Sequence, residues 1–377
     1  MVNRDVSLSV LLSAGRSGLH RIGRTQVSAV EQTSEQFAQR LFEAALGTVD
    51  ILAIHLGDRL GWYSALAAGP ADAAELTTRA GGDRRYAQEW LEQQAATGIL
   101  TVTPDGRFAL PAGPAEVLTD TNSLDYLAPL ARMLAGAAVQ LPALVRAYRE
   151  GGGVGWSEYG TDVRESQADM NRPWFEHRLA VDLATVPDVH ALLSAPGARV
   201  ADIGSGGGWS SIALARAYPD LRVDGYDIDP PSIAMATANA ADLADRVHFH
   251  HADVTTDLPE SAYDVVFAFE CVHDMPYPVE VLSAARRALR PSGVVIVMDE
   301  AVDPDFASPA SDVDRLMYGF SLLVCLPDGM AHPGSAGTGT VMRAEQLEEY
   351  AHKAGFTTLD ILPIENFGFW RFYRLTV

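Results

Sequence analysis

Apolar and helical stretches alternate over the C-terminal half of the chain. Five short apolar runs have the length and composition of buried parallel strands: residues 198–203, 221–227, 247–251, 263–270 and 294–298. Stretches with helical spacing of apolar residues separate them, and this alternation predicts an α/β fold with a doubly wound, mostly parallel sheet. Two further strand patterns, 357–363 and 369–377, predict seven strands in all, with an antiparallel last strand.

The N-terminal part has a different pattern. Apolar residues at helical spacing predict helices over residues 37–56, 62–67, 71–80 and 84–97. A small β-hairpin is predicted around Pro104-Asp105-Gly106. Helices followed by a hairpin are typical of a winged helix. We therefore predict four segments: a flexible tail at 1–31, a winged-helix-like domain at 32–122, a helical connector or lid at 123–177, and the α/β domain at 178–377.

Charge and cysteine content narrow the choice of partners and location. The formal net charge of −21 argues against nucleic acid or an anionic membrane as the main partner. Residues 36–120 carry 11 acidic and 6 basic residues, and the would-be recognition helix contains Glu89 and Glu92, so a DNA-binding regulator is only the minor alternative. The two cysteines make no disulfide framework and no zinc site. No apolar run is long enough for a transmembrane helix, and a cytoplasmic protein is expected.

The most informative stretch is Val200-Ala201-Asp202-Ile203-Gly204-Ser205-Gly206-Gly207-Gly208-Trp209. An apolar strand breaks into a glycine loop that opens a helix, which is how a doubly wound unit begins. A dinucleotide-binding loop would have the spacing Gly-x-Gly-x-x-Gly, with a pyrophosphate at the helix N-terminus. Here the spacing is Gly-x-Gly-x-Gly, and Asp202 stands two residues before the first glycine. This stretch resembles motif I of class I S-adenosylmethionine-dependent methyltransferases.

The resemblance implies a Rossmann-like fold and S-adenosylmethionine as the cofactor. Asp227 ends the second strand, where one carboxylate can accept hydrogen bonds from two ribose hydroxyls, and Asp229 is the alternative. In that family an acid at the position of Asp253 accepts from the adenine amine, and Ile228 would pack on the adenine face. The expected cofactor-binding residues are Asp202, Gly204, Ser205, Gly206, Gly208, Asp227, Ile228, Asp253, Val254, Phe269 and Glu270.

Candidate chemistry follows the fourth strand, at the edge where ligands bind in open α/β folds. Val272-His273-Asp274-Met275 looks like the Leu-His-Asp-Trp stretch of plant-type O-methyltransferases, with Met275 in place of the tryptophan. In that family the histidine is the general base, which implies that His273 takes a proton from a hydroxyl acceptor. Asp299, or alternatively Glu300, would orient its imidazole. A packing role is the alternative for His273, and Glu270 would bind either substrate or the cofactor ammonium.

Scattered aromatic, polar and methionine side chains are candidates for the acceptor site. The predicted substrate contacts are Tyr159, Asn171, Trp174, Asp274, Met317 and Phe320. Plain packing is the alternative for 156–174 and 312–330. Cys325 is interpreted as a small buried hydrophobe, and no metal ligand set is expected.

The whole pattern is similar to bacterial small-molecule methyltransferases that carry a winged-helix dimerisation domain. That resemblance implies a homodimer that methylates a small molecule, at oxygen first and at carbon or nitrogen next. The alternative is a family member that uses the same cofactor for decarboxylation, hydroxylation or cyclisation.

Overall fold

The computed structural model describes residues 32–377, and the tail predicted at 1–31 lies outside the described residues. The chain divides into two compact units, one ending at Ala135 and one running from Gly136 to Val377. The finer division predicted at 122/123 and at 177/178 stays a prediction.

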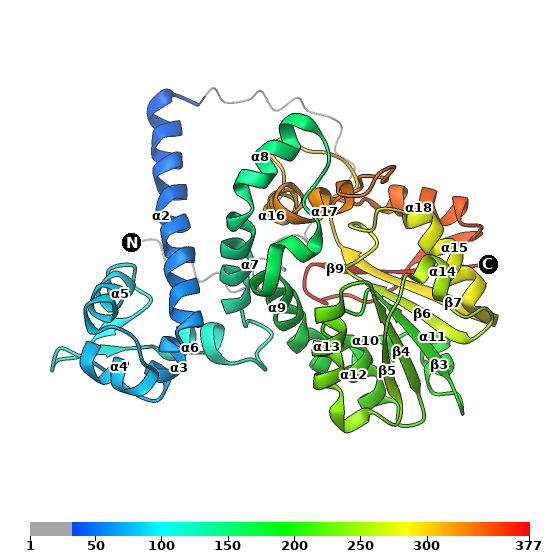
Figure 1. Cartoon of the computed structure of the whole chain (residues 1–377), viewed down its shortest axis with the longest axis horizontal. Helices are drawn as coiled ribbons and strands as arrows, with labels where there is room; N and C mark the ends of the chain where they lie inside the picture. Colours follow the sequence, from blue (N-terminus) through cyan, green and yellow to red (C-terminus); the bar gives the residue numbers. More distant parts are fainter. Residues whose placement is uncertain (1–31) are drawn as a thin grey trace. The chain divides into compact units, whose positions relative to one another are not determined.

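The N-terminal unit consists of helices and one small hairpin (Figure 1). Its elements are α2 (Ser34–Arg59), α3 (Trp62–Ala67), α4 (Ala73–Ala80), α5 (Arg84–Ala96), β1 (Thr101–Val102), β2 (Phe108–Ala109) and α6 (Ala112–Thr119). The side chains of Thr33, Asp72 and Asp83 cap α2, α4 and α5 by accepting backbone N–H groups. Trp62 and Trp90 pack edge to face in its core. The order of helices and hairpin is the predicted one, and α2 is longer than the periodicity indicated.

The second unit is built on a seven-stranded sheet. Its strands are β3 (Arg199–Ile203), β4 (Arg222–Asp227), β5 (Val247–His251), β6 (Tyr263–Phe269), β7 (Leu289–Glu300), β8 (Thr358–Ile361) and β9 (Trp370–Thr376). They lie in the order β5-β4-β3-β6-β7-β9-β8, and β9 alone runs in the opposite direction to the other six strands. The predicted α/β fold with an antiparallel last strand is confirmed.

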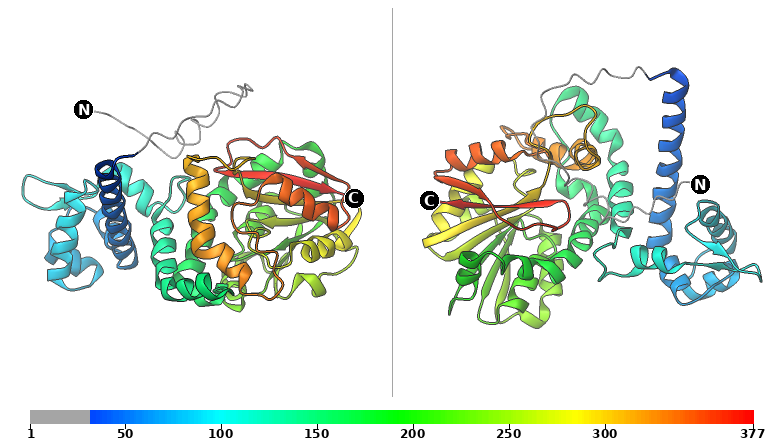
Figure 2. Two further views of the ribbon diagram at one scale, coloured as in Figure 1. Left: turned by 90° about the horizontal axis from the view of Figure 1, so that it is seen from above. Right: turned by 180° about the vertical axis from the view of Figure 1, so that it is seen from behind.

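Helices cover both faces of this sheet (Figures 1 and 2). One group contains α12 (Trp209–Ala217) and α13 (Pro230–Asn239), which is followed by the short helix η2 (Ala241–Leu243), and the other contains α14 (Val254–Asp257), α15 (Pro278–Ala288) and α18 (Ala344–Lys353). Burial on both faces explains why the strands read as continuous apolar runs. The chain proceeds from β3 outward to β5 and then returns to β6 on the other side of β3, so the topological switch point lies between β3 and β6.

Helical segments precede the sheet and interrupt it. They are α7 (Ala128–Val139), α8 (Leu141–Glu150), α9 (Trp156–Trp174), η1 (Phe175–Leu179), α10 (Ala180–Leu183), α11 (Pro187–Leu193), α16 (Asp312–Phe320), η3 (Ser321–Cys325) and α17 (Leu326–Met330). Residues 156–174, which lack clear periodicity, form one helix with a kink at Gly160, where φ is 73°. Among the described residues no single helix could span a membrane, and only the bent pair α7 and α8 reaches the required length and composition.

Candidate active site

The glycine loop joins β3 to α12 at the carboxyl edge of the sheet. Gly204, Gly206 and Gly208 have φ values of 68°, 50° and 77°, in the left-handed region that favours glycine. A Cβ at Gly208 would lie 2.6 Å from the ring of Phe249, so this position also requires glycine for lack of space. At Gly206, by contrast, a Cβ would meet nothing within 4 Å, so the loop backbone is open to a ligand there.

Asp202 lies on β3 beneath the loop and is 1% exposed. Its Oδ2 accepts hydrogen bonds of 2.6 Å from the hydroxyls of Ser210 and Ser211, and its Oδ1 has no partner within the described part of the chain. Burial raises the pKa of Asp202 to about 6, although the two hydroxyls oppose the shift. This carboxylate fixes the first turn of α12 against the sheet.

Asp227 and Asp229 have different surroundings. Asp227 accepts from the backbone N–H of Gly206 at 2.9 Å and from that of Asp229 at 2.8 Å, which links the end of β4 to the glycine loop. Asp229 caps α13 by accepting from Ser232, and it forms an ion pair with Arg164, which donates from Nε and Nη2 of its guanidinium. Asp229 is therefore engaged by a helix terminus and a cation, whereas the Asp227 carboxylate faces the cavity described next.

A cavity of about 300 Å³ opens at this edge of the sheet. This volume is at the lower end of the range for small-molecule sites. Nine of the expected cofactor residues line it: Gly204, Ser205, Gly206, Asp227, Ile228, Asp253, Val254, Phe269 and Glu270. Asp202 and Gly208 lie behind the lining. Three donors and acceptors of α9 also border the cavity, namely Arg164, Gln167 and Asn171.

The nucleoside end of this cavity combines acids with an apolar side chain. Asp253 caps α14, and its Oδ1 accepts from the backbone N–H of Thr255 at 2.9 Å. The side chain of Ile228 is 61% exposed, although it is apolar, and it borders the cavity beside Asp227. Two acids and an apolar side chain thus border one cavity, in the arrangement expected for the ribose and adenine of S-adenosylmethionine.

Glu270 directly follows β6 and has a left-handed backbone with φ of 49°, which is uncommon for a residue with a Cβ. Its carboxylate accepts from Gln167 at 3.1 Å and also from Asn171 and Trp370. Burial, reinforced by the charge of Glu300, raises the pKa of Glu270 to about 8. Because Trp370 and Gln167 are about a hundred residues away in the sequence, local patterns give no sign of this cluster.

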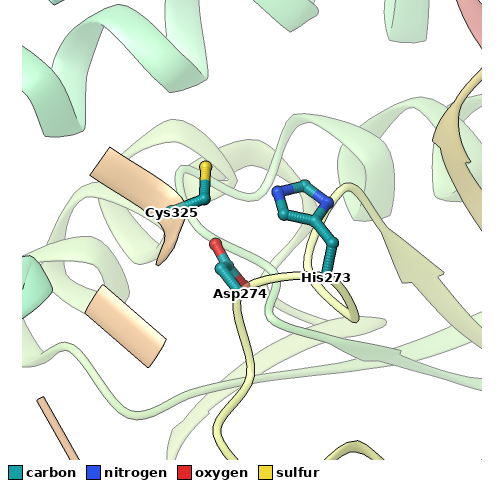
Figure 3. A group of neighbouring side chains, drawn as sticks. All are labelled: His273, Asp274 and Cys325. Carbon is teal, nitrogen blue, oxygen red and sulfur yellow. The ribbon is translucent and has the colours of Figure 1, made fainter. Parts of the chain in front are cut away.

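His273 is buried and bonded to acids on β7. Its Nδ1 lies 2.7 Å from Asp299 Oδ1 and 3.2 Å from Glu300 Oε2, so both candidate orienting acids contact it. Burial alone would lower the pKa of His273, but the charges of Asp299 and Glu300 raise it well above its usual value. Figure 3 shows its ring directed toward Cys325 and Asp274.

The six predicted substrate residues fall into two groups. Asn171 and Asp274 line the cavity, and the Oδ1 of Asn171 has no hydrogen-bond partner within residues 32–377. The other four do not border it. The hydroxyl of Tyr159 donates to the Leu323 carbonyl at 2.7 Å, Trp174 packs on Phe367 and Trp370, Met317 is 1% exposed, and Phe320 is half-buried on α16. Their role in substrate binding stays a prediction.

Several lining residues were not predicted from the sequence. They include Trp156, Gln167, Tyr277, Asp328 and His332. Asp328 accepts from the backbone N–H of Trp156 at 2.7 Å, which joins the start of α9 to α17. Burial raises the pKa of Asp328 to about 6 and that of Asp274 to about 7. The acceptor side of the cavity is therefore rich in carboxyl groups.

Comparison with known proteins agrees with this geometry. Residues 200–293 match a family model described as a methyltransferase domain. The chain is 35% identical over 160 residues to 27-O-demethylrifamycin SV methyltransferase of Amycolatopsis mediterranei, a match that covers 41% of this chain and 58% of that protein. It is 28% identical over 276 residues to 3-hydroxy-5-methyl-1-naphthoate 3-O-methyltransferase of Streptomyces sahachiroi, covering 70% of this chain and 76% of that protein.

A solved structure extends the similarity to nearly the whole fold. Human N-acetylserotonin methyltransferase in complex with S-adenosylmethionine superposes with a TM-score of 0.67 at 17% identity, over 90% of this chain and 99% of that one. The strand order, the glycine loop and these similarities define a class I methyltransferase. The family model and the similar sequences identify residues 200–293 as a methyltransferase domain, with S-adenosylmethionine as its cofactor.

Proposed function

We propose that this protein transfers the methyl group of S-adenosylmethionine to a hydroxyl oxygen of a small molecule, with His273 as the general base. The observation that carries the proposal is the 2.7 Å contact between His273 Nδ1 and Asp299 Oδ1; both residues are buried, and Asp274, which directly follows His273, lines the cavity. The names of the two relatives, a 27-O-demethylrifamycin SV methyltransferase and a 3-hydroxy-5-methyl-1-naphthoate 3-O-methyltransferase, support the same acceptor atom.

The residues around the cavity have distinct roles in this proposal. Asp227 holds the ribose hydroxyls, Asp253 and the backbone of Val254 hold the adenine edge, and Ile228 packs on the ring. When bound, the cofactor supplies an activated methyl group for an in-line displacement. The protein then mainly aligns the acceptor and excludes water.

In this proposal His273 removes the proton from the acceptor hydroxyl. A carboxylate only accepts hydrogen bonds, so contact with Asp299 places the proton of the neutral ring on Nδ1 and leaves Nε2 to act. The acids that raise the pKa of His273 also make it a stronger base, at the cost of a larger protonated fraction at neutral pH.

The test is stoichiometric product analysis with a panel of hydroxylated aromatic and polyketide-like acceptors. O-methylation predicts one S-adenosylhomocysteine and one methyl ether for each acceptor consumed. A product formed without S-adenosylhomocysteine would instead identify one of the non-methylating reactions and contradict the proposal.

We also propose that the protein is a homodimer that pairs through α2 and works in the cytoplasm. Large apolar side chains recur along one stripe of this helix and are 43–62% exposed: Phe37, Leu41, Phe42, Leu46, Val49, Leu52 and Leu56. Such an exposed apolar stripe is typical of an interaction surface. A cytoplasmic location is supported by the two free cysteines.

Light scattering during size-exclusion chromatography tests the dimer. Phe42→Glu combined with Leu46→Glu should produce a monomer, because two charges would be buried in the interface. Gly47→Glu, on the opposite side of the same helix and with nothing within 4 Å of its Cβ position, is the matched control and should leave the dimer intact. A monomeric wild-type protein would contradict this part of the proposal.

A further inference from the structure

Three side chains with different metal-ligating atoms meet beside the cavity. A ring nitrogen of His273, a carboxylate oxygen of Asp274 and the thiol sulfur of Cys325 lie within 4.8 Å of one another. Figure 3 shows the three groups pointing into a common space. Cys325 ends η3, whereas the other two follow β6, so the fold and not a sequence motif brings them together.

The surroundings of His273 match those of a metal-bound histidine. Metal-ligating histidines usually bond their second ring nitrogen to a carboxylate, which fixes the ring and increases its basicity. Here Asp299 occupies Nδ1 at 2.7 Å, and Nε2 is the atom left to face Cys325 and Asp274. Tetrahedral zinc with bond lengths of about 2.0–2.3 Å separates its ligand atoms by about 3.5 Å, so small side-chain movements would close the set.

We propose that His273, Asp274 and Cys325 form a binding site for a borderline-soft divalent cation, Zn²⁺ foremost. A thiolate and an imidazole select zinc or similar transition metals over magnesium and calcium. Asp274 borders the cavity and gives the ion a path of entry. On binding, the metal displaces the thiol proton of Cys325 and, where His273 is protonated, the proton on its Nε2, and the displaced protons are released to solvent. A bound ion occupies Nε2 of His273, so zinc inhibits proton removal from the acceptor.

The inhibitory effect rests on the proposed function, whereas the metal site itself does not. Co²⁺ titration of the full-length reduced protein therefore tests the site without any acceptor. Wild type should take up one Co²⁺ and develop thiolate-to-cobalt charge-transfer absorption in the near ultraviolet, which Zn²⁺ then abolishes by displacement. Cys325→Ser should lose the charge-transfer absorption.

The chain offers a matched control in its only other cysteine. Cys271 donates to the Ile203 carbonyl at 3.2 Å, so Cys271→Ser should keep the absorption. Asp299→Asn should weaken Co²⁺ binding about 10- to 100-fold, the usual effect of losing a carboxylate behind a ligating histidine. No absorption in the wild type, or absorption retained in Cys325→Ser, would overturn the site.

A turnover measurement with equimolar Zn²⁺ distinguishes the proposed metal site from the proposed role of His273 as general base. Inhibition of the wild type but not of Cys325→Ser supports the inhibitory role. If Co²⁺ binds with the expected absorption but Zn²⁺ leaves turnover unchanged, the metal site stands and the role of His273 as base fails.

Discussion

The cofactor end and the acceptor end of the cavity are built in different ways. The cofactor end takes its residues from the glycine loop and from the ends of β4 and β5, where local backbone geometry dictates side-chain position. The acceptor end combines α9, the residues after β6, α17 and β9, so its geometry depends on packing between distant segments. The residues of the first end can therefore be located from local sequence patterns, whereas those of the second cannot.

The largest expected effect belongs to the acceptor end. His273→Ala should reduce kcat by about 100- to 10,000-fold, the range for losing a general base, while S-adenosylhomocysteine affinity stays unchanged. Steady-state kinetics and calorimetric titration measure the two quantities. His177→Ala, an exposed histidine on η1, is the control. A kcat within a few-fold of the wild-type value would show that His273 is not the general base and would indicate a packing role.

At the cofactor end, Asp227→Ala should weaken S-adenosylhomocysteine binding by about 1–3 kcal/mol, because two ribose hydroxyls lose a buried acceptor. Isothermal titration calorimetry checks this value. Asp245→Ala, an exposed position in the same unit, should have no effect. Unchanged affinity in Asp227→Ala would assign the ribose to another group, with Asp229 the first candidate.

The pH dependence of kcat tests the role of His273 at the acceptor end of the cavity. A base must be unprotonated, and Asp299 and Glu300 raise the pKa of His273 well above its usual value. Below that pKa, kcat should therefore rise about tenfold for each pH unit. Asp299→Asn removes one negative charge, which lowers the pKa and should move the profile to lower pH. A profile that is flat from pH 6 to pH 9, roughly the range over which histidine and the raised carboxyls titrate, contradicts the assignment.

The smallest predicted effect concerns the adenine face. Ile228→Ala should weaken S-adenosylhomocysteine binding by about 1 kcal/mol, because the variant loses burial against the ring equivalent to about one methylene group. Calorimetry on this variant beside Asp227→Ala ranks the two contacts. An effect of Ile228→Ala larger than that of Asp227→Ala would reverse their proposed importance.

The difference between the two ends of the cavity also determines how much of the site can be predicted from the sequence. The positions of the strands and the α/β class follow from the apolar runs and their alternation with helices, and both Asp227 and His273 stand after strands that periodicity locates. Gln167 and Trp370 bond Glu270 from segments about a hundred residues away, and no local pattern encodes that contact. Residues 156–174 form a helix because their sequence packs against the sheet unit, although their own periodicity is weak.

A crystal structure of the protein with S-adenosylhomocysteine would show where each part of the cofactor product lies. We expect the ribose hydroxyls on Asp227, the adenine between Ile228 and Asp253, and the sulfur between the carboxyl ends of β3 and β6, facing Nε2 of His273. A ligand whose sulfur points away from His273, or whose ribose is held elsewhere than Asp227, would contradict this expectation.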